Sequence, residues 1–375
     1  MRACGDFGHD AAERRMRTLL SREPVRQNRS IARDDRSSSF VAARFDTENN
    51  GGVARHVDCA STPRDMAASS PRLRLGTRGS PLALAQAHMT RAALMAAHGW
   101  GEDAVEIVTI TTDGDRIQDR PLADIGGKAL WTKTLDRALL EGRTDASVHS
   151  MKDVETDRPE GIAIAAMLER ADVRDRLIGA ASIEGLPDNA IIGTASPRRG
   201  AQLRRLRPDL KIVPFRGNVA TRIARVENGE AHATLLAAAG LDRLGQSHVG
   251  APIAVETMLP AVAQGAVGIE CRADDAATHA LLAAIGHAPT QMCVTAERAL
   301  LRALGGSCHS PIGVLARIDD GRVWLRAEIL SEDGSEQRGG ETRYALGDEG
   351  APGVLARRLL ADASPALAAL FSCAS

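Results

Sequence analysis

Apolar and polar residues begin to alternate regularly near Arg72, and from there the chain divides into strands and helices. "RLRLGT" alternates as a strand does, and "RGSPLALAQAHMTRAALMAAHG" has helical spacing, with Ser80 at the N-cap, Pro81 at the first helical position and Gly99 at the end. The pattern next predicts a strand in "VEIVTIT", a helix in "KALWTKTLDRALLEG" and strands in "ASVHS" and "GIAIAAML". This alternation predicts an α/β fold with parallel pairings.

A second region repeats the same opening. "AIIGTASPRRGAQLRRL" is again a strand, a Gly-Thr pair and a Ser-Pro pair that opens a helix, with a gap one residue different from that in "RLRLGTRGSPLALAQ". A strand in "KIVPF", a helix from "NVATRIARVENG" and a strand in "ATLLAAA" follow. Each turn would present backbone N–H groups at a helix N-terminus, which bind anions. Two ordinary Ser-Pro caps are the alternative, so the repetition alone does not establish a duplication.

The first 70 or so residues show no sustained period. They are rich in Arg, Asp, Ser and Asn, as in "RDDRSSSF" and "TENNGG". Such a composition buries too little apolar surface to offset the entropy lost on ordering. We predict a disordered extension, or residues upstream of the true start codon. The acidic residues argue against an Arg-rich transit peptide.

The composition excludes several functional classes. The chain has 375 residues, of which 44% are hydrophobic but only 2% aromatic, and its formal net charge is −1. This balance gives no general attraction to nucleic acid or to an anionic membrane, and it offers few aromatic rings for stacking bases. No apolar run approaches the roughly 18 residues of a membrane helix, and no secretory segment is evident. Six cysteines without a CxxC pair suit neither a disulfide framework nor a zinc site. We expect a cytoplasmic protein that binds neither nucleic acid nor membrane.

Arginines gather beside the second Ser-Pro turn. Arg198 and Arg199 begin that helix, and Arg216 follows the next strand. Because arginine forms two-pronged contacts with carboxylates and phosphates, a cleft between two lobes would suit a ligand with several negative charges. Arg205, beyond the first turn, is expected on a solvated face. Lys128 lies in "IGGKALW", which lacks the GxxxxGK[ST] pattern of a phosphate loop.

Two further positions are candidates for chemistry. Lys152 and Asp153 follow the strand "ASVHS", where an α/β sheet presents functional groups, although a solvated surface pair is the alternative. Cys308 lies in "LGGSCHSPIGV", a polar Gly-rich loop, whereas a structural cysteine normally packs in a core. Cys308 and His309 are adjacent and have no partner at a ligand spacing, so we predict no metal site.

Six motifs occur in order: "LGTRGSPLALAQ", "VHSMKDV", "GTASPRRGAQL", "FRGNVATR", "LPAVAQGAVGIECR" and "GGSCHSPIG". Together they resemble the hydroxymethylbilane synthase family, also called the porphobilinogen deaminase family, from about Arg72 to the C-terminus. Four departures are Trp131 for the usual Phe, Ala195 for a common Ser, Pro197 for a common Leu and Glu155 for a frequent Pro. None removes a catalytic group.

This resemblance implies a fold and a reaction. The fold has two lobes like those of periplasmic solute-binding proteins, each with a mostly parallel sheet, and a small C-terminal α/β domain. The family's reaction condenses four porphobilinogen molecules, releases four ammonias and yields the linear tetrapyrrole hydroxymethylbilane in haem and chlorophyll biosynthesis. It uses a covalent dipyrromethane cofactor, and the family suggests a monomer. Each pyrrole ring carries an acetate and a propionate, which fits the arginine density.

The resemblance also implies domain boundaries. Residues 1–70 are the extension, residues 71–170 with 258–280 form lobe 1, and residues 171–257 form lobe 2. Residues 288–375 form the C-terminal domain, which carries the cofactor cysteine. We expect strands there in "IGVLARI" and "RVWLRAEIL" and a last helix near "GVLARRLLADA".

Roles follow from the matched positions. Asp153 is implied to be the catalytic acid/base, whose carboxylate stabilises the cation formed when ammonia leaves. Cys308 is implied to carry the cofactor through a thioether. The residues implied to hold the cofactor are Lys152, Thr194, Ser196, Arg198, Arg199 and Arg216. Those implied to bind substrate are Arg78, Ser80, Gln86, Lys128, Arg222 and Arg243. A non-catalytic two-lobed binding module for an anionic ligand is the alternative, but it leaves Cys308 and Asp153 unexplained.

Overall fold

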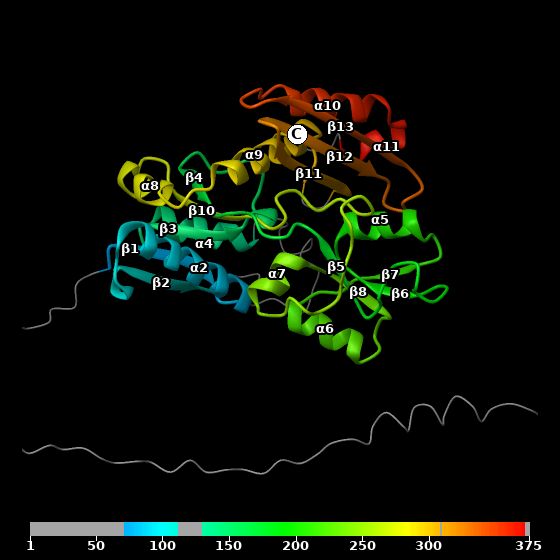
Figure 1. Cartoon of the computed structure of the whole chain (residues 1–375), viewed down its shortest axis with the longest axis horizontal. Coiled ribbons are helices and arrows are strands. Elements are labelled where there is room, and N and C mark those ends of the chain that lie inside the picture. Colours follow the sequence, from blue (N-terminus) through cyan, green and yellow to red (C-terminus); the bar gives the residue numbers. More distant parts are fainter. Residues whose placement is uncertain (1–70, 112–129, 308–309, 372–375) are drawn as a thin grey trace, which may run out of the picture. The chain divides into compact units, whose positions relative to one another are not determined.

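The computed structural model describes residues 71–111, 130–307 and 310–371, apart from the side chains of Leu130 and Trp131. All of these belong to one compact unit, residues 65–375, whose described part is coloured in Figure 1. The predicted extension, Lys128 and Cys308 lie outside the described residues. What the sequence predicts for them therefore stays a prediction.

The first sheet has the strand order β2-β1-β3-β10-β4. Its strands are β1 (Leu73–Arg78), β2 (Val105–Ile110), β3 (Ala146–Ser150), β4 (Ile162–Met167) and β10 (Val267–Arg272). Strand β1 pairs in parallel with β2 and β3, whereas β10 is antiparallel to β3 and β4. Four strands therefore run in one direction, and the reversed strand lies inside the sheet (Figure 1).

The helical elements of this region are α2 (Pro81–His98), η1 (Glu102–Ala104), α4 (Leu130–Leu140), η3 (Met151–Asp153) and α8 (Ala276–Ala283). Helices α2 and α8 pack with the strands around a core in which Leu75, Leu94 and Ile269 are fully buried, whereas α4 contributes to a separate cluster with the end of β2. The predicted cap of α2 is confirmed: Ser80 accepts a hydrogen bond from the N–H of Ala83, and Gly99 ends the helix at a φ of 63°.

The second sheet has the order β7-β6-β8-β5-β9. Its elements are β5 (Asp175–Ile178), β6 (Ile191–Gly193), α5 (Pro197–Leu206), β7 (Lys211–Val213), α6 (Val219–Glu227), β8 (Ala233–Ala237), α7 (Ala238–Arg243) and β9 (Ala251–Pro252). Strand β6 is parallel to β7 and β8, and β5 is the reversed strand. The last residue of β6 is Gly193, where a side chain has no room because a Cβ would lie 2.3 Å from the Phe215 ring.

A third, antiparallel sheet consists of β11 (Ile312–Asp319), β12 (Arg322–Leu330) and β13 (Gln337–Ala345). It packs with α9 (Ala288–Ala303), α10 (Ala351–Ala361) and α11 (Pro365–Ala369) around a core that contains Leu300, Leu325 and Phe371. Helix α10 is the predicted one, but α11 follows it, so the prediction that α10 is last is wrong. The α/β class, with two parallel-rich sheets and a small third region, is confirmed; the exact domain boundaries stay predictions.

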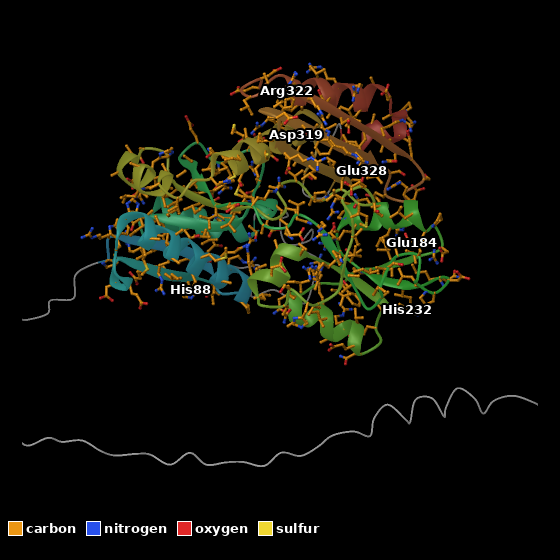
Figure 2. All side chains as sticks on the ribbon, in the orientation of Figure 1. His88, Glu184, His232, Asp319, Arg322 and Glu328 are labelled. Atoms are coloured by element: carbon orange, nitrogen blue, oxygen red, sulfur yellow. The ribbon has the colours of Figure 1, made fainter. Side chains whose placement is uncertain are left out.

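One buried ion pair joins the segments that connect the three sheets. Arg170, which follows β4, donates through Nη1 and Nη2 to the two carboxylate oxygens of Glu297 in α9, at 2.7 and 3.0 Å. The same carboxylate accepts the N–H of Ala263, which precedes β10, and that of Ala316 in β11. Glu297 is fully buried. A second link joins α5 to the third sheet, since Gln202 donates to the buried Glu328, labelled in Figure 2.

Replacing Glu297 by Gln should strongly destabilise the fold, because Arg170 would keep a buried charge without its counter-ion. Breaking a buried pair in this way typically costs about 3–5 kcal/mol. The matched control is Glu141→Gln in the Glu141–Arg143 pair, whose side chains are about half exposed and for which about 0–1 kcal/mol is typical. Urea unfolding followed by circular dichroism measures both, and equal shifts in the two variants would contradict the assignment.

Candidate active site

A cavity of about 450 Å³ lies where the three sheets meet. One wall is the segment from Met151 to Asp157, a second is the start of α5, and a third is the loop on either side of Cys308. The residues of that loop which line the cavity are Gly306, Ser307, Ser310 and Ile312. The two candidate regions of the sequence, far apart along the chain, thus face one space.

Strand β3 positions the first wall. After Ser150 the chain makes the short turn η3, in which the N–H of Met151 donates to the carbonyl of Ala266 at 3.1 Å. The Met151 side chain is buried in a small core with Val154. These anchors leave Lys152 half-buried and Asp153 exposed at the cavity. Within the described part of the chain, no hydrogen bond or ion pair holds the Asp153 carboxylate, so it is available to a ligand.

The second wall contains two arginines that share one carboxylate. Asp175, at the start of β5, forms ion pairs with Arg198 at 2.9 Å and with Arg199 at 2.6 Å. All three side chains are buried. Although burial opposes it, the two guanidinium groups hold the pKa of Asp175 well below its usual range. Gln264 donates to the same carboxylate at 3.0 Å. The shared aspartate fixes both arginines before any ligand binds.

Each of these arginines nevertheless has hydrogen-bonding capacity left. The Nε–H groups of Arg198 and Arg199 are buried and have no partner among the described residues. Both residues line the cavity, so their guanidinium charge favours an anionic group of a ligand there.

The cavity lowers the pKa of its other cations. Burial is the main cause for Lys152, to which the charge of Arg199 adds and which Asp153 opposes. For Arg222, burial and then Arg199 lower the pKa to about 10, against the effect of Asp153. Two cations that are each disfavoured in the charged form gain most from a ligand that brings negative charge.

The predicted site residues fall into three groups. Those that line the cavity are Lys152, Asp153, Ser196, Arg198, Arg199 and Arg222. Those that lie outside its lining are Arg78, Ser80, Gln86, Thr194, Arg216 and Arg243. Those outside the described residues are Lys128 and Cys308.

Three residues of the second group contact the cavity lining or residues next to it in the chain. Gln86 of α2 exchanges hydrogen bonds with Ser150, immediately before η3. The Thr194 hydroxyl accepts the N–H of Ser196 at 3.2 Å. The Arg243 guanidinium donates to the carbonyl of Gly265, beside Gln264. By contrast, the predicted solvated face is wrong for Arg205, which is half-buried and contacts the carbonyl of Thr257.

Sequence reasoning missed Asp175 and Arg298, and it gave Gln264 no role. Asp175 lies in "RADVRDRLIG", a charged stretch in which no local pattern distinguishes the buried residue from its exposed neighbours. Arg298 lines the cavity from α9. An arginine on an otherwise apolar helical face is the one signal for it, and that signal is weak.

The fold and site together define an α/β protein whose sheets enclose an anion-accepting cavity with a free carboxylate. Residues 73–280 match the family model described as porphobilinogen deaminase, dipyromethane cofactor binding domain. Residues 291–356 match the model described as porphobilinogen deaminase, C-terminal domain. The chain belongs to the porphobilinogen deaminase family.

Two curated relatives carry the same name. The porphobilinogen deaminase of Sphingopyxis alaskensis is 57% identical over 314 residues, which cover 82% of this chain and 99% of the relative. That of Paracoccus denitrificans is 55% identical over 267 residues, which cover 70% of this chain and 85% of the relative. The resemblance found in the sequence motifs is confirmed, and the chain is an enzyme of tetrapyrrole biosynthesis.

Solved structures show only distant likeness. A lysine-bound periplasmic His/Glu/Gln/Arg/opine family-binding protein from Silicibacter pomeroyi is 18% identical, with a TM-score of 0.32, over 57% of this chain and 88% of that one. A putative periplasmic sulfonate-binding protein from Methylobacillus flagellatus is 14% identical, with the same score, over 62% and 67%. Scores this low support no inference about function.

Two kinds of feature are absent from the described residues. No helix among them has both the length and the apolar character needed to span a bilayer. No group of three or more His, Cys, Asp or Glu side chains among them is arranged to hold a metal ion.

Because its pKa is lowered, Lys152 should react with amine-acetylating reagents at an unusually low pH for a lysine. Only the neutral amine is nucleophilic, so Lys152 should reach half-maximal acetylation at a lower pH than the exposed Lys211. Mass spectrometry of peptides from Cys308→Ser protein, acetylated over a pH series, measures both profiles without a group bound at residue 308. Coincident profiles would contradict the burial of the Lys152 amine.

Proposed function

We propose that the protein condenses four porphobilinogen molecules head to tail into hydroxymethylbilane with release of four ammonias, on a dipyrromethane cofactor attached to Cys308. One observation carries the proposal: both sides of the Cys308 loop line the same cavity as Lys152 and Asp153. A group tethered at that loop would lie beside the carboxylate that the reaction needs. Membership of the family supports the substrate and the cofactor.

The cavity wall suits the cofactor. Arg198 and Arg199 line the cavity, and arginine binds carboxylates such as the acetate and propionate groups of a dipyrromethane. Lys152 and Ser196 lie on the same walls. When bound, the cofactor supplies a nucleophilic pyrrole carbon to which the first substrate is joined. We assign Thr194 and Arg216 to its surroundings, Thr194 through its contact with Ser196.

Asp153 is the proposed catalytic residue. Its carboxylate is exposed to the cavity and has no partner among the described residues. As ammonia leaves the aminomethyl group of porphobilinogen, positive charge develops on the substrate, and a carboxylate nearby stabilises it. The same group accepts hydrogen bonds from pyrrole N–H groups and takes up or delivers a proton.

The remaining predicted residues are assigned to the carboxylates of incoming rings. These are Arg78, Ser80, Gln86, Lys128, Arg222 and Arg243. Arg222 lines the cavity, and its lowered pKa favours an anionic partner. We further propose the domain division given above, a monomer, and a cytoplasmic location. The alternative, a non-catalytic binding module, has no support from the comparisons. Both curated relatives are named porphobilinogen deaminase, and this chain matches them over 99% and 85% of their lengths.

The mass of the purified protein tests the cofactor assignment. The protein should be heavier than its sequence by two linked pyrrole units and should turn pink with Ehrlich-type aldehyde reagents. Cys308→Ser should show neither property, whereas Cys293→Ser, which alters a buried core thiol, should keep both. An unmodified mass in an active preparation would overturn the assignment.

Replacing Asp153 by Asn tests the catalytic role. The change keeps the size but removes the charge, so turnover should fall on the order of a hundredfold or more. Asp153→Glu keeps the charge one methylene away and should be less impaired than Asn but still clearly slower. Single-turnover ammonia release is measured on protein shown by mass to carry its cofactor. If cofactor-loaded Asp153→Asn releases ammonia at the wild-type rate, a group other than Asp153 stabilises the positive charge on the substrate.

A further inference from the structure

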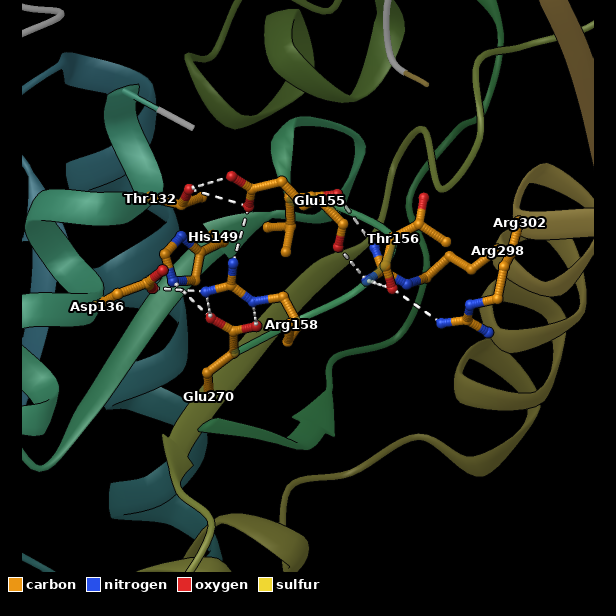
Figure 3. A network of polar contacts seen from close by, with 10 residues as sticks. Thr132, Asp136, His149, Glu155, Thr156, Arg158, Glu270, Arg298 and Arg302 are labelled. Carbon is orange, nitrogen blue, oxygen red and sulfur yellow. Dashed lines mark hydrogen bonds and ion pairs between the residues drawn. The ribbon is translucent and has the colours of Figure 1, made fainter. Parts of the chain in front are cut away.

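A buried arginine lies a few residues after Asp153 and binds three carboxylates. Arg158 is 7% exposed and contacts Asp136 of α4 at 2.5 Å, Glu155 at 2.8 Å and Glu270 of β10 at 2.7 Å. Figure 3 shows the three acids converging on the one guanidinium from three different elements. The role assigned to the cavity does not use this cluster.

Glu155 connects the cluster to the catalytic segment. It lines the cavity two residues after Asp153, and its carboxylate also accepts the hydroxyl hydrogen of Thr132, in the first turn of α4, at 2.9 Å. Through Glu155, the segment that carries Asp153 is therefore joined to α4 and to Arg158.

Negative groups outnumber positive groups in this cluster, so each contact with Arg158 matters for its stability. Three carboxylates face one guanidinium, and His149 Nε2 lies 3.2 Å from Glu270. Burial raises the pKa of Asp136, against the effect of Arg158. For Glu270, His149 and Arg158 outweigh burial and lower the pKa to about 2. The buried Glu270 therefore depends on His149 and Arg158 together, and three carboxylates hold Arg158 in place.

The backbone of the same segment is held from the opposite side. Arg298 of α9 is buried and donates to the carbonyl oxygens of Val154, Glu155 and Thr156 (Figure 3). The residues after Asp153 are thus fixed through their backbone by α9 and through the Glu155 side chain by the Arg158 cluster. Asp153 itself has no such anchor among the described residues, so its position depends on these neighbours.

We propose that Glu155 and Arg158 are positioning residues that hold the Asp153 carboxylate in place for the reaction; this rests on the proposed function. Two residues of chain span at most about 7 Å, so a shift at Glu155 is transmitted to Asp153. Displacing a catalytic group by about 1 Å can cost about a hundredfold in rate. Neither residue needs to touch the substrate for this effect.

The test compares Glu155→Ala with Glu160→Ala, an exposed glutamate in the same segment. Glu155→Ala should lower kcat about tenfold or more and leave KM within about twofold, whereas Glu160→Ala should leave both unchanged. Glu155→Gln keeps an acceptor for Thr132 but loses the charge that faces Arg158, so it should fall between Ala and wild type. If the alanine variant does not fold, Glu155→Gln carries the test.

A double variant separates positioning from a general structural role. In an Asp153→Asn background, Glu155→Ala (or Gln) should cause little additional loss, because the group that it positions is already disabled. Losses that multiply would show that Glu155 acts independently of Asp153 and would overturn the proposal. So would unchanged kinetics of the single variant, or a rise in KM with kcat unchanged, which would place Glu155 in substrate binding.

Cofactor mass and wild-type activity keep the two hypotheses distinct. All variants are compared only after intact mass has shown equal cofactor loading. If the wild-type protein carries no dipyrromethane and releases no ammonia from porphobilinogen, the proposed function fails. If it does both and Glu155→Ala matches it, only the positioning proposal fails.

Discussion

The arrangement of the site depends on one buried ion pair, between Arg170 and Glu297. The two residues lie on different parts of the structure: Arg170 leads from the first sheet toward the second, and Glu297 belongs to the helix beside the third. The same carboxylate binds the N–H of Ala263 on the returning chain and that of Ala316 in β11. Because both oxygens are saturated, the pair can be buried without leaving an unsatisfied charge. It fixes the three walls of the cavity relative to one another.

A second constraint is the way in which charge is distributed around the cavity. Asp175 takes up part of the positive charge of Arg198 and Arg199 and aligns them at the cavity wall. Another wall has a carboxylate, Asp153, that forms no ion pair or hydrogen bond with a described side chain. An anionic chain can thus be held on one side while a developing cation is stabilised on the other. The cavity can do both because Asp175 is paired with arginines, whereas Asp153 forms no ion pair among the described residues.

Local patterns predicted what local forces determine. The Ser80 and Ser196 caps and the strand ends that carry Lys152 and Asp153 follow from short-range rules, and the structure contains them. Contacts between segments that are distant in the sequence could not be predicted from any local sequence pattern. Arg158 reads as part of a polar loop in "VETDRPEG", and Asp175 as one charge among several; their burial depends on partners up to 112 residues away. Arg205 was misplaced for the same reason, since its contact is with Thr257.

The reversed strand β10 has a consequence for how the chain reaches this structure. It lies between β3 and β4, yet it follows them by about a hundred residues, and the whole second sheet is encoded in between. On a ribosome, the second sheet can close as soon as its last strand emerges, whereas the first must wait with its two inner edges open. Exposed strand edges are where chains associate wrongly. A stalled or truncated product ending before residue 267 would therefore be the form of this protein most prone to aggregate.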